Sequence, residues 1–148
     1  MQVAASLIAL SLVLTPAAVF SGEGFDVIVL GASGGIQDGN LSSYLIRPHG
    51  DRNAIACDAG SLVNGLKVAQ EKGVFRDTRV PQGSIDSVVG HVLKNEIKGY
   101  LISHAHLDHV GGLVIASPDD NNKTIYSLPS GSAGLEQLRF RDVPATKT

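Results

Sequence analysis

Cysteine is nearly absent from this 148-residue chain, in which Cys57 is the only one. A single cysteine excludes an intrachain disulfide, whatever compartment the protein occupies. Residues 54–57 read Ala-Ile-Ala-Cys, a run typical of a buried strand, where cysteine behaves as a small hydrophobe. We therefore interpret Cys57 as a structural residue.

Clusters of basic side chains are also missing. The 12 Lys and Arg residues nearly balance the 14 Asp and Glu residues, for a formal net charge of -2. Nucleic-acid-binding proteins usually carry a concentrated basic patch, so we expect no nucleic-acid partner. With 43% hydrophobic residues, the composition is that of a single ordinary globular domain.

Charge is absent from the first 22 residues, and residues 7–14 form a short apolar stretch. This length, together with the break at Pro16, favours a signal peptide over 1–22 and a secreted or periplasmic location. A retained membrane anchor is the alternative, because the segment has no Lys or Arg and no clean Ala-x-Ala site. If the leader is removed, residues 23–148 form the mature domain, with no stable membrane association.

The remaining apolar pattern alternates between strands and helices. Three short apolar runs separated by turn residues predict a β-meander, with strands at 25–30, 41–47 and 54–57. Helical spacing then predicts helices at 61–73 and 84–93, with Ile85 in the buried face of the second. Further along, we expect strands at 97–103 and 123–128 and an apolar helix at 110–117. The order indicates an α/β fold.

The strand predicted at 97–103 leads directly into three histidines and one aspartate. Because side chains alternate faces in an extended segment, His104 and His106 point the same way and can bind one metal ion. Asp108 and His109 follow where the strand gives way to a turn, so they can address a second ion. The alternative is a polar loop without chemistry, but histidine is a rare residue, and three histidines with an aspartate within six positions argue against it.

Paired metal ions favour hydrolysis. Two ions about 3.5–4 Å apart can activate a water and clamp a phosphoryl or carbonyl oxygen. Mixed imidazole and carboxylate ligands suit zinc, with manganese or iron as alternatives. We therefore expect two divalent metal ions, zinc above all, as cofactors.

Three further features bear on the interpretation of this cluster. Asp58 ends a strand before a glycine turn, where a carboxylate often orients a ligand histidine, although a turn-forming or helix-capping role is the alternative. The glycine-rich turn at 31–35 looks like a dinucleotide fingerprint but lacks the helix that should follow. His91 lies beside an apolar stripe, and we interpret it as a surface or packing residue.

The run 104–109 matches the HxHxDH motif of the metallo-β-lactamase superfamily. Its extension, Val-Gly-Gly-Leu-Val-Ile-Ala-Ser-Pro at 110–118, resembles the signature of the class II cyclic-nucleotide phosphodiesterases. The segments 29–35, 41–45 and 58–60 are similar to that family's N-terminal region. The resemblance implies a metallo-β-lactamase-like αββα sandwich, of which this chain would form the N-terminal half.

The same resemblance implies a role for each site residue. His104 and His106 would ligate one metal ion, and Asp108 and His109 the other, with Asp58 supporting the site from behind. The implied reaction is hydrolysis of a 3′,5′-cyclic nucleotide, cAMP foremost, to the 5′-nucleotide by a water that two metals activate. Asp108 would help to orient or deprotonate that water. The implied partner is therefore a small-molecule cyclic nucleotide.

The chain departs from this family because no histidine follows His109, whereas family members have further ligands downstream. Later aspartates are few, and two of them, Asp119 and Asp120, are expected in a solvated surface turn. Unless His49 or His91 completes the site, each ion would have only two protein ligands.

The family pattern is also lost in the polar segment 131–148, which favours a fragment. As isolated, such a chain would bind metal weakly and dissolve poorly, because core surface would be exposed. One alternative is another hydrolase of the superfamily, acting on a lactam, thioester, RNA or phosphonate. The other is an inactive metal-binding remnant.

Overall fold

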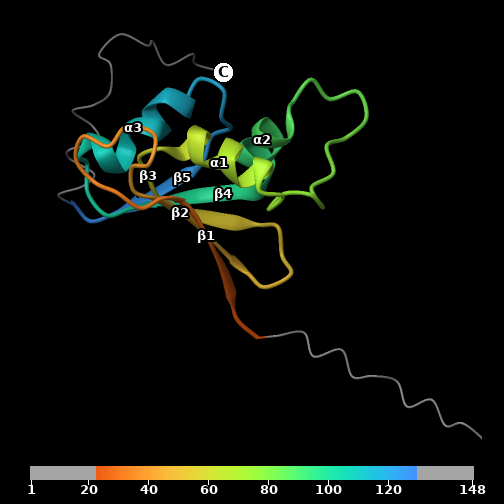
Figure 1. The fold of residues 1–148 in the computed structure, drawn as a ribbon, viewed down its shortest axis with the longest axis horizontal. Coiled ribbons are helices and arrows are strands. Elements are labelled where there is room, and N and C mark those ends of the chain that lie inside the picture. Colours follow the sequence, from red (N-terminus) through yellow and green to blue (C-terminus); the bar gives the residue numbers. More distant parts are fainter. Residues whose placement is uncertain (1–22, 130–148) are drawn as a thin grey trace, which may run out of the picture.

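The computed structural model describes residues 23–129, which form one five-stranded sheet with helices on one of its faces (Figure 1). The signal peptide predicted at 1–22 and the polar segment at 131–148 lie outside the described residues. The domain boundary after residue 22 therefore stays a prediction. Within residues 23–129, every helix is too short or too polar to cross a membrane.

The sheet begins with the predicted meander. β1 (Phe25–Gly31), β2 (Ser43–Pro48) and β3 (Ala54–Ala59) pair antiparallel in sequence order. The glycine-rich turn lies between β1 and β2, and no helix forms over residues 32–42. The turn therefore joins two strands, as predicted, and is not a dinucleotide-binding fingerprint.

Two further strands extend the sheet in parallel. β4 (Ile97–Ile102) pairs with β3, and β5 (Thr124–Ser127) pairs with β4. Parallel neighbours need a crossover connection, usually helical. Here α1 (Leu62–Glu71) lies in the first crossover and α3 (Leu107–Ala116) in the second.

The helix predicted at 84–93 begins later than expected. A short helix, α2 (Val88–His91), continues into a π-helical turn, η1 (Val92–Glu96), that leads into β4. Ser87 is the N-cap of α2, because its hydroxyl accepts a hydrogen bond from the Gly90 N–H at 3.1 Å. The prediction that Ile85 is buried is consequently wrong: it precedes the helix and is 100% exposed.

The core lies between the sheet and the helices. Its most deeply buried large side chains come from β2, β4, α1, η1 and α3: Leu45, Leu62, Leu66, Val92, Ile97, Tyr100, Ile102 and Val110. Burying apolar surface stabilises the fold by roughly 25 cal/mol per Å². This layer therefore holds the strand ends in place.

A buried polar cluster corrects one expectation. Asp120 was expected in a solvated turn, yet its side chain is only 5% exposed. The Tyr100 hydroxyl donates to Asp120 at 2.6 Å, and Lys123 forms an ion pair with the same carboxylate. Lys123 also donates to the Leu93 carbonyl at 2.9 Å. The turn before β5 is thus tied to β4 and η1.

The other face of the sheet is apolar and carries no described helix (Figure 1). Cross-strand partners place one side chain from each strand in a row: Val29, Tyr44, Cys57, Leu101 and Tyr126. We call this row the outer row. Cys57 is only partly buried within it, which is less than a fully buried strand would predict.

Candidate metal centre

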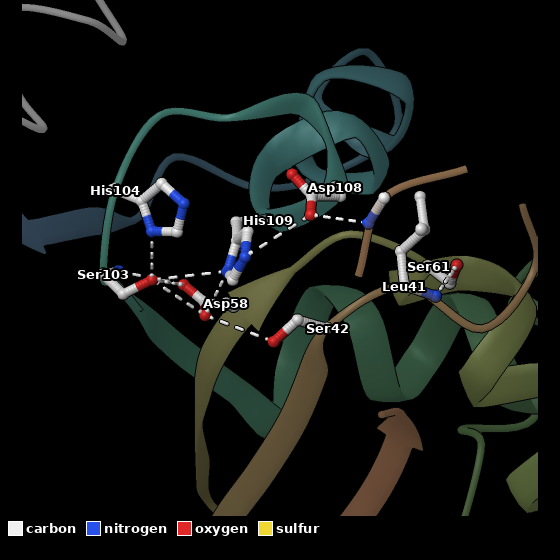
Figure 2. A network of polar contacts seen from close by, with 9 residues as sticks. Leu41, Ser42, Asp58, Ser61, Ser103, His104, Asp108 and His109 are labelled. Carbon is white, nitrogen blue, oxygen red and sulfur yellow. Dashed lines mark hydrogen bonds and ion pairs between the residues drawn. The ribbon is translucent and has the colours of Figure 1, made fainter. Parts of the chain in front are cut away.

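The histidine cluster lies where β4 ends, beside the end of β3 (Figure 2). Sites in α/β folds usually gather at the carboxyl ends of parallel strands. Asp58 comes from β3 and Ser103 directly follows β4, so the parallel pairing brings them together. The cluster therefore occupies the position that the sequence predicted.

Asp58 is the hub of this cluster (Figure 2). It has a left-handed backbone, with φ of 53°, which is unusual for a residue other than glycine. Its carboxylate accepts from the Ser103 N–H at 2.9 Å, from Nδ1 of His109 at 2.7 Å and from the Ser42 hydroxyl at 3.3 Å. The contact with His109 thus supports the expectation that Asp58 orients a histidine.

These contacts also set the charge on Asp58. Partial burial raises the pKa of this carboxyl, but the hydrogen bonds from Ser103 and His109 outweigh it, so the pKa lies below its usual value. Asp58 is therefore a carboxylate at neutral pH. An ionised carboxylate only accepts hydrogen bonds.

The three histidines come together as predicted. The ring centroids of His104 and His109 lie 4.0 Å apart, and those of His104 and His106 lie 4.6 Å apart. His106 stands in extended backbone just before α3, with φ of -69° and ψ of 145°. His109 lies in the first turn of α3, which begins at Leu107, three residues earlier than expected.

Asp108 is held from a different direction. Its Oδ2 accepts a hydrogen bond from the Gly35 N–H at 3.0 Å and lies 3.7 Å from Nε2 of His109. The Gly35 bond lowers the pKa of Asp108, and the nearby imidazoles act in the same direction. The first turn of a helix also favours negative charge. The glycine-rich turn therefore borders the site and keeps Asp108 ionised.

Two glycines let α3 approach the end of β3 closely. The Gly112 N–H donates to the Gly60 carbonyl at 2.8 Å. A side chain at Gly60 would collide with the Asp108 carbonyl oxygen, because the two backbones leave no room for a Cβ atom. The site therefore depends on this backbone-to-backbone approach.

His49 and His91 do not join the cluster. Nδ1 of His49 pairs with Asp26 at 2.8 Å, beyond the end of β2 that lies away from Asp58. His91 contacts Asn95 at 3.2 Å, in the helical segment that precedes β4. The interpretation of His91 as a surface or packing residue agrees with this placement.

The donor set suits a metal in its chemistry. Imidazole nitrogens and a carboxylate are the ligands that zinc prefers besides thiolate, and the His104 ring lies against the rings of both His106 and His109. Among residues 23–129, however, no three His, Cys, Asp or Glu side chains are arranged to hold one ion. The chemistry of the donors therefore fits, but the described residues alone do not complete a coordination shell.

Two contributors to the site were missed from the sequence. Ser103 bonds to Asp58 and to both His104 and His109, and Gly35 positions Asp108. The position of Ser103 between the strand and the first histidine was a usable signal, since a hydroxyl there faces the same edge. Gly35 acts through its backbone N–H, and its residue type does not reveal this.

The mixed sheet with its helices, together with the HxHxDH run after β4, is typical of the metallo-β-lactamase-type α/β fold. The structure is similar to the crystal structure of unliganded yeast PDE1, with a TM-score of 0.61 and 25% sequence identity over 82% of this chain and 46% of that chain. A family model described as class-II cAMP phosphodiesterases matches residues 25–142, and the chain belongs to this family.

Curated relatives agree with this assignment. A 3′,5′-cyclic-nucleotide phosphodiesterase of Aliivibrio fischeri is 53% identical over 116 residues, which cover 78% of this chain and 35% of that protein. A cAMP/cGMP-dependent 3′,5′-cAMP/cGMP phosphodiesterase 7 of Dictyostelium discoideum is 39% identical over 98 residues, 63% of this chain and 23% of that protein. The chain thus matches only about a third or less of the length of these relatives.

Proposed function

We propose that this chain supplies part of the active site of a 3′,5′-cyclic-nucleotide phosphodiesterase, with cAMP as the foremost substrate. The observation that carries the proposal is the convergence of His104, His106, Asp108 and His109 at the end of β4. The family of the chain and the names of its relatives support the substrate class.

Two divalent metal ions, zinc foremost, are part of the proposal. His104 and His106 would hold one ion, and Asp108 and His109 the other. When bound, such ions lower the pKa of water and stabilise charge on the phosphate oxygens. Since each pair has two donors, we expect further ligands from outside residues 23–129.

In this proposal, Asp108 is the residue that orients and deprotonates the attacking water, and its charge and position support that role. It is ionised at neutral pH, because the Gly35 N–H lowers its pKa. Its side chain is 21% exposed, and the oxygen that the Gly35 N–H anchors, Oδ2, lies 3.7 Å from Nε2 of His109. A carboxylate held in this way can orient a water and accept a proton as the water oxygen attacks phosphorus. The P–O3′ bond then breaks, and O3′ leaves as a hydroxyl with the proton that Asp108 accepted from the water.

A chimera tests the proposal. In the chimera, residues 25–128 of this chain would replace the matching segment of the Aliivibrio fischeri relative. All other residues would be those of the relative. We expect hydrolysis of cAMP to 5′-AMP, measured by chromatography, in preference to a β-lactam and a thioester. Asp108→Asn should lower kcat by about 10²- to 10⁴-fold.

Asp119→Asn is the matched control, because this exposed carboxylate lies beyond α3, away from the site, and it should leave kcat unchanged. A folded chimera that turned over neither cAMP nor cGMP would refute the proposed function. Faster hydrolysis of the lactam or thioester would replace it with the corresponding activity.

A further inference from the structure

The hydroxyl of Ser103 lies between one carboxylate and two imidazoles (Figure 2). Its Oγ is 2.9 Å and 3.0 Å from the two oxygens of Asp58, 3.0 Å from Nδ1 of His104 and 3.3 Å from Nδ1 of His109. A serine hydroxyl has a single hydrogen and two acceptor lone pairs. The four contacts therefore allow only a few arrangements of hydrogens.

The ionised Asp58 decides among these arrangements. If Ser103 donated its hydrogen to His104, its oxygen would face two carboxylate oxygens at about 3 Å with no hydrogen between them. Such a contact between acceptors is unfavourable. The Ser103 hydroxyl consequently donates to Asp58, and its oxygen accepts from Nδ1–H of His104. This leaves the lone pair of His104 on Nε2.

His109 adopts the same tautomer through a direct contact with Asp58. Its Nδ1 lies 2.7 Å from Oδ2 of Asp58, closer than to the Ser103 hydroxyl. The carboxylate can only accept, so His109 also carries its hydrogen on Nδ1. One carboxylate thus orients two imidazoles, His109 directly and His104 through Ser103.

We infer that Ser103 is a positioning residue, which transmits the orientation set by Asp58 to His104 and keeps Nε2 of His104 free to bind a metal. The inference rests on the metal-binding role proposed above. It assigns Ser103 a separate function from Asp58, because the Ser103 N–H holds Asp58 at 2.9 Å whatever the side chain at position 103. Losing the hydroxyl should therefore affect His104 and spare His109.

The tautomers can be measured directly. In the metal-free 148-residue chain with ¹⁵N-labelled histidine, at about pH 8 where an ordinary imidazole is neutral, two-bond ¹H–¹⁵N spectra show which nitrogen carries the hydrogen. We expect Nδ1–H at both His104 and His109. Ser103→Ala should change the dominant tautomer of His104 alone, Ser103→Thr should restore it, and Asp58→Ala should release both histidines.

Metal affinity provides a second measurement. Loss of a side chain that orients a ligand typically weakens metal binding by about 10- to 100-fold. We expect this loss for Zn²⁺ in Ser103→Ala, measured by competition with a chromophoric chelator, and recovery in Ser103→Thr. Ser117→Ala is the control, because that exposed hydroxyl donates only within its own helix, to the Val114 carbonyl at 2.8 Å.

Two results would overturn the inference: an unchanged His104 tautomer in Ser103→Ala, or a change at His109 as large as at His104. Failure of Ser103→Thr to restore either readout would do the same. Since neither measurement involves a nucleotide, an inactive chimera would refute the phosphodiesterase proposal and leave the role of Ser103 standing.

Discussion

Asp58 and Asp120 are carboxylates with different surroundings. Asp58 lies at the end of β3 among serine and histidine side chains. Asp120 lies before β5 and is enclosed by Tyr100 and Lys123. The first is placed to orient imidazoles, whereas the second is fully engaged in joining β5 to the core. Residue type alone does not separate these roles.

The Tyr100 hydroxyl should contribute measurably to stability. Its ring is buried, and burial together with the Asp120 carboxylate raises the pKa of Tyr100, so the hydroxyl remains a donor. Tyr100→Phe removes that donor from a buried charged acceptor and should lower the free energy of unfolding by about 1–3 kcal/mol. Urea denaturation followed by circular dichroism measures the change.

Tyr126→Phe is the matched control, because Tyr126 lies on the next strand and is 56% exposed. It should change the free energy of unfolding by no more than about 0.5 kcal/mol. Equal losses in the two variants would show that the hydrogen bond to Asp120 contributes nothing.

The ion pair between Lys94 and Asp86 should depend on pH at both ends of the scale. Nζ of Lys94 lies 2.6 Å from Oδ1 of Asp86; this contact lowers the pKa of Asp86 below 3.8 and raises that of Lys94 above 10.5. The stability from Asp86 is therefore present above about pH 3.8 and lost below it. That from Lys94 is present below about pH 10.5 and lost above it.

Lys94→Met should accordingly move the pKa of Asp86 back up toward 3.8, as followed by NMR of the side-chain carboxyl. Lys72→Met, at the exposed C-terminal end of α1, should leave that pKa unchanged. An Asp86 titration that is the same in both variants would contradict the assignment of the shift to Lys94.

At the scale of elements, α3 is positioned by its glycines. The N-terminal turn of α3 carries Asp108 and His109, and the helix packs against the turn after β3. A side chain at Gly112 would come within 2.6 Å of the Ala59 carbonyl oxygen and of the Leu62 amide. The same glycine that weakens a helix in isolation is thus required for the approach.

Substitutions of the neighbouring Gly111 and Gly112 should change the free energy of unfolding in opposite directions. Gly112→Ala should lower the free energy of unfolding by about 1–3 kcal/mol, because backbone atoms cannot move aside easily. A side chain at Gly111 has only one contact, 3.9 Å from the Gly60 carbonyl. Gly111→Ala should therefore raise the free energy of unfolding by about 0.5–1 kcal/mol through helix propensity. Thermal or urea denaturation distinguishes these signs, and equal destabilisation would contradict the packing argument.

At the scale of the whole molecule, the sheet has two faces of different character. The helix-covered face is closely packed, whereas the outer row leaves Val29 59% and Leu101 50% exposed. Contiguous apolar surface of this kind commonly marks an interaction site or leads to association. This exposed apolar surface is the physical reason for which we expect the isolated chain to dissolve poorly.

Leu101→Lys should reduce self-association of the 148-residue chain. Burying a leucine contributes about 1.5–3 kcal/mol, and about half of Leu101 is still exposed, so the association constant should fall roughly tenfold. Sedimentation velocity over a range of concentrations measures it. Ile115→Lys, at a position of the helical face that is 75% exposed, should have little effect. A larger effect there would place the association on the helices.

The sequence allowed the order of strands and helices to be predicted, along with the place of the histidine cluster. Each of these depends on local patterns: alternating apolar residues, turn residues and the run 104–109. Predictions failed where distant groups compete. Ile85 is exposed because Ser87 caps the helix after it, and Asp120 is buried because Tyr100 and Lys123 pair with it.

What the sequence by itself determined is the set of donor side chains, their spacing, and the strand that precedes them. Only the tertiary structure decided how they are oriented. Asp58 contacts His109 across 51 positions of sequence, and Gly35 contacts Asp108 across 73. Such contacts depend on the parallel pairing of β3 with β4 and on the close approach of α3. Neither local propensity nor spacing encodes these long-range backbone arrangements.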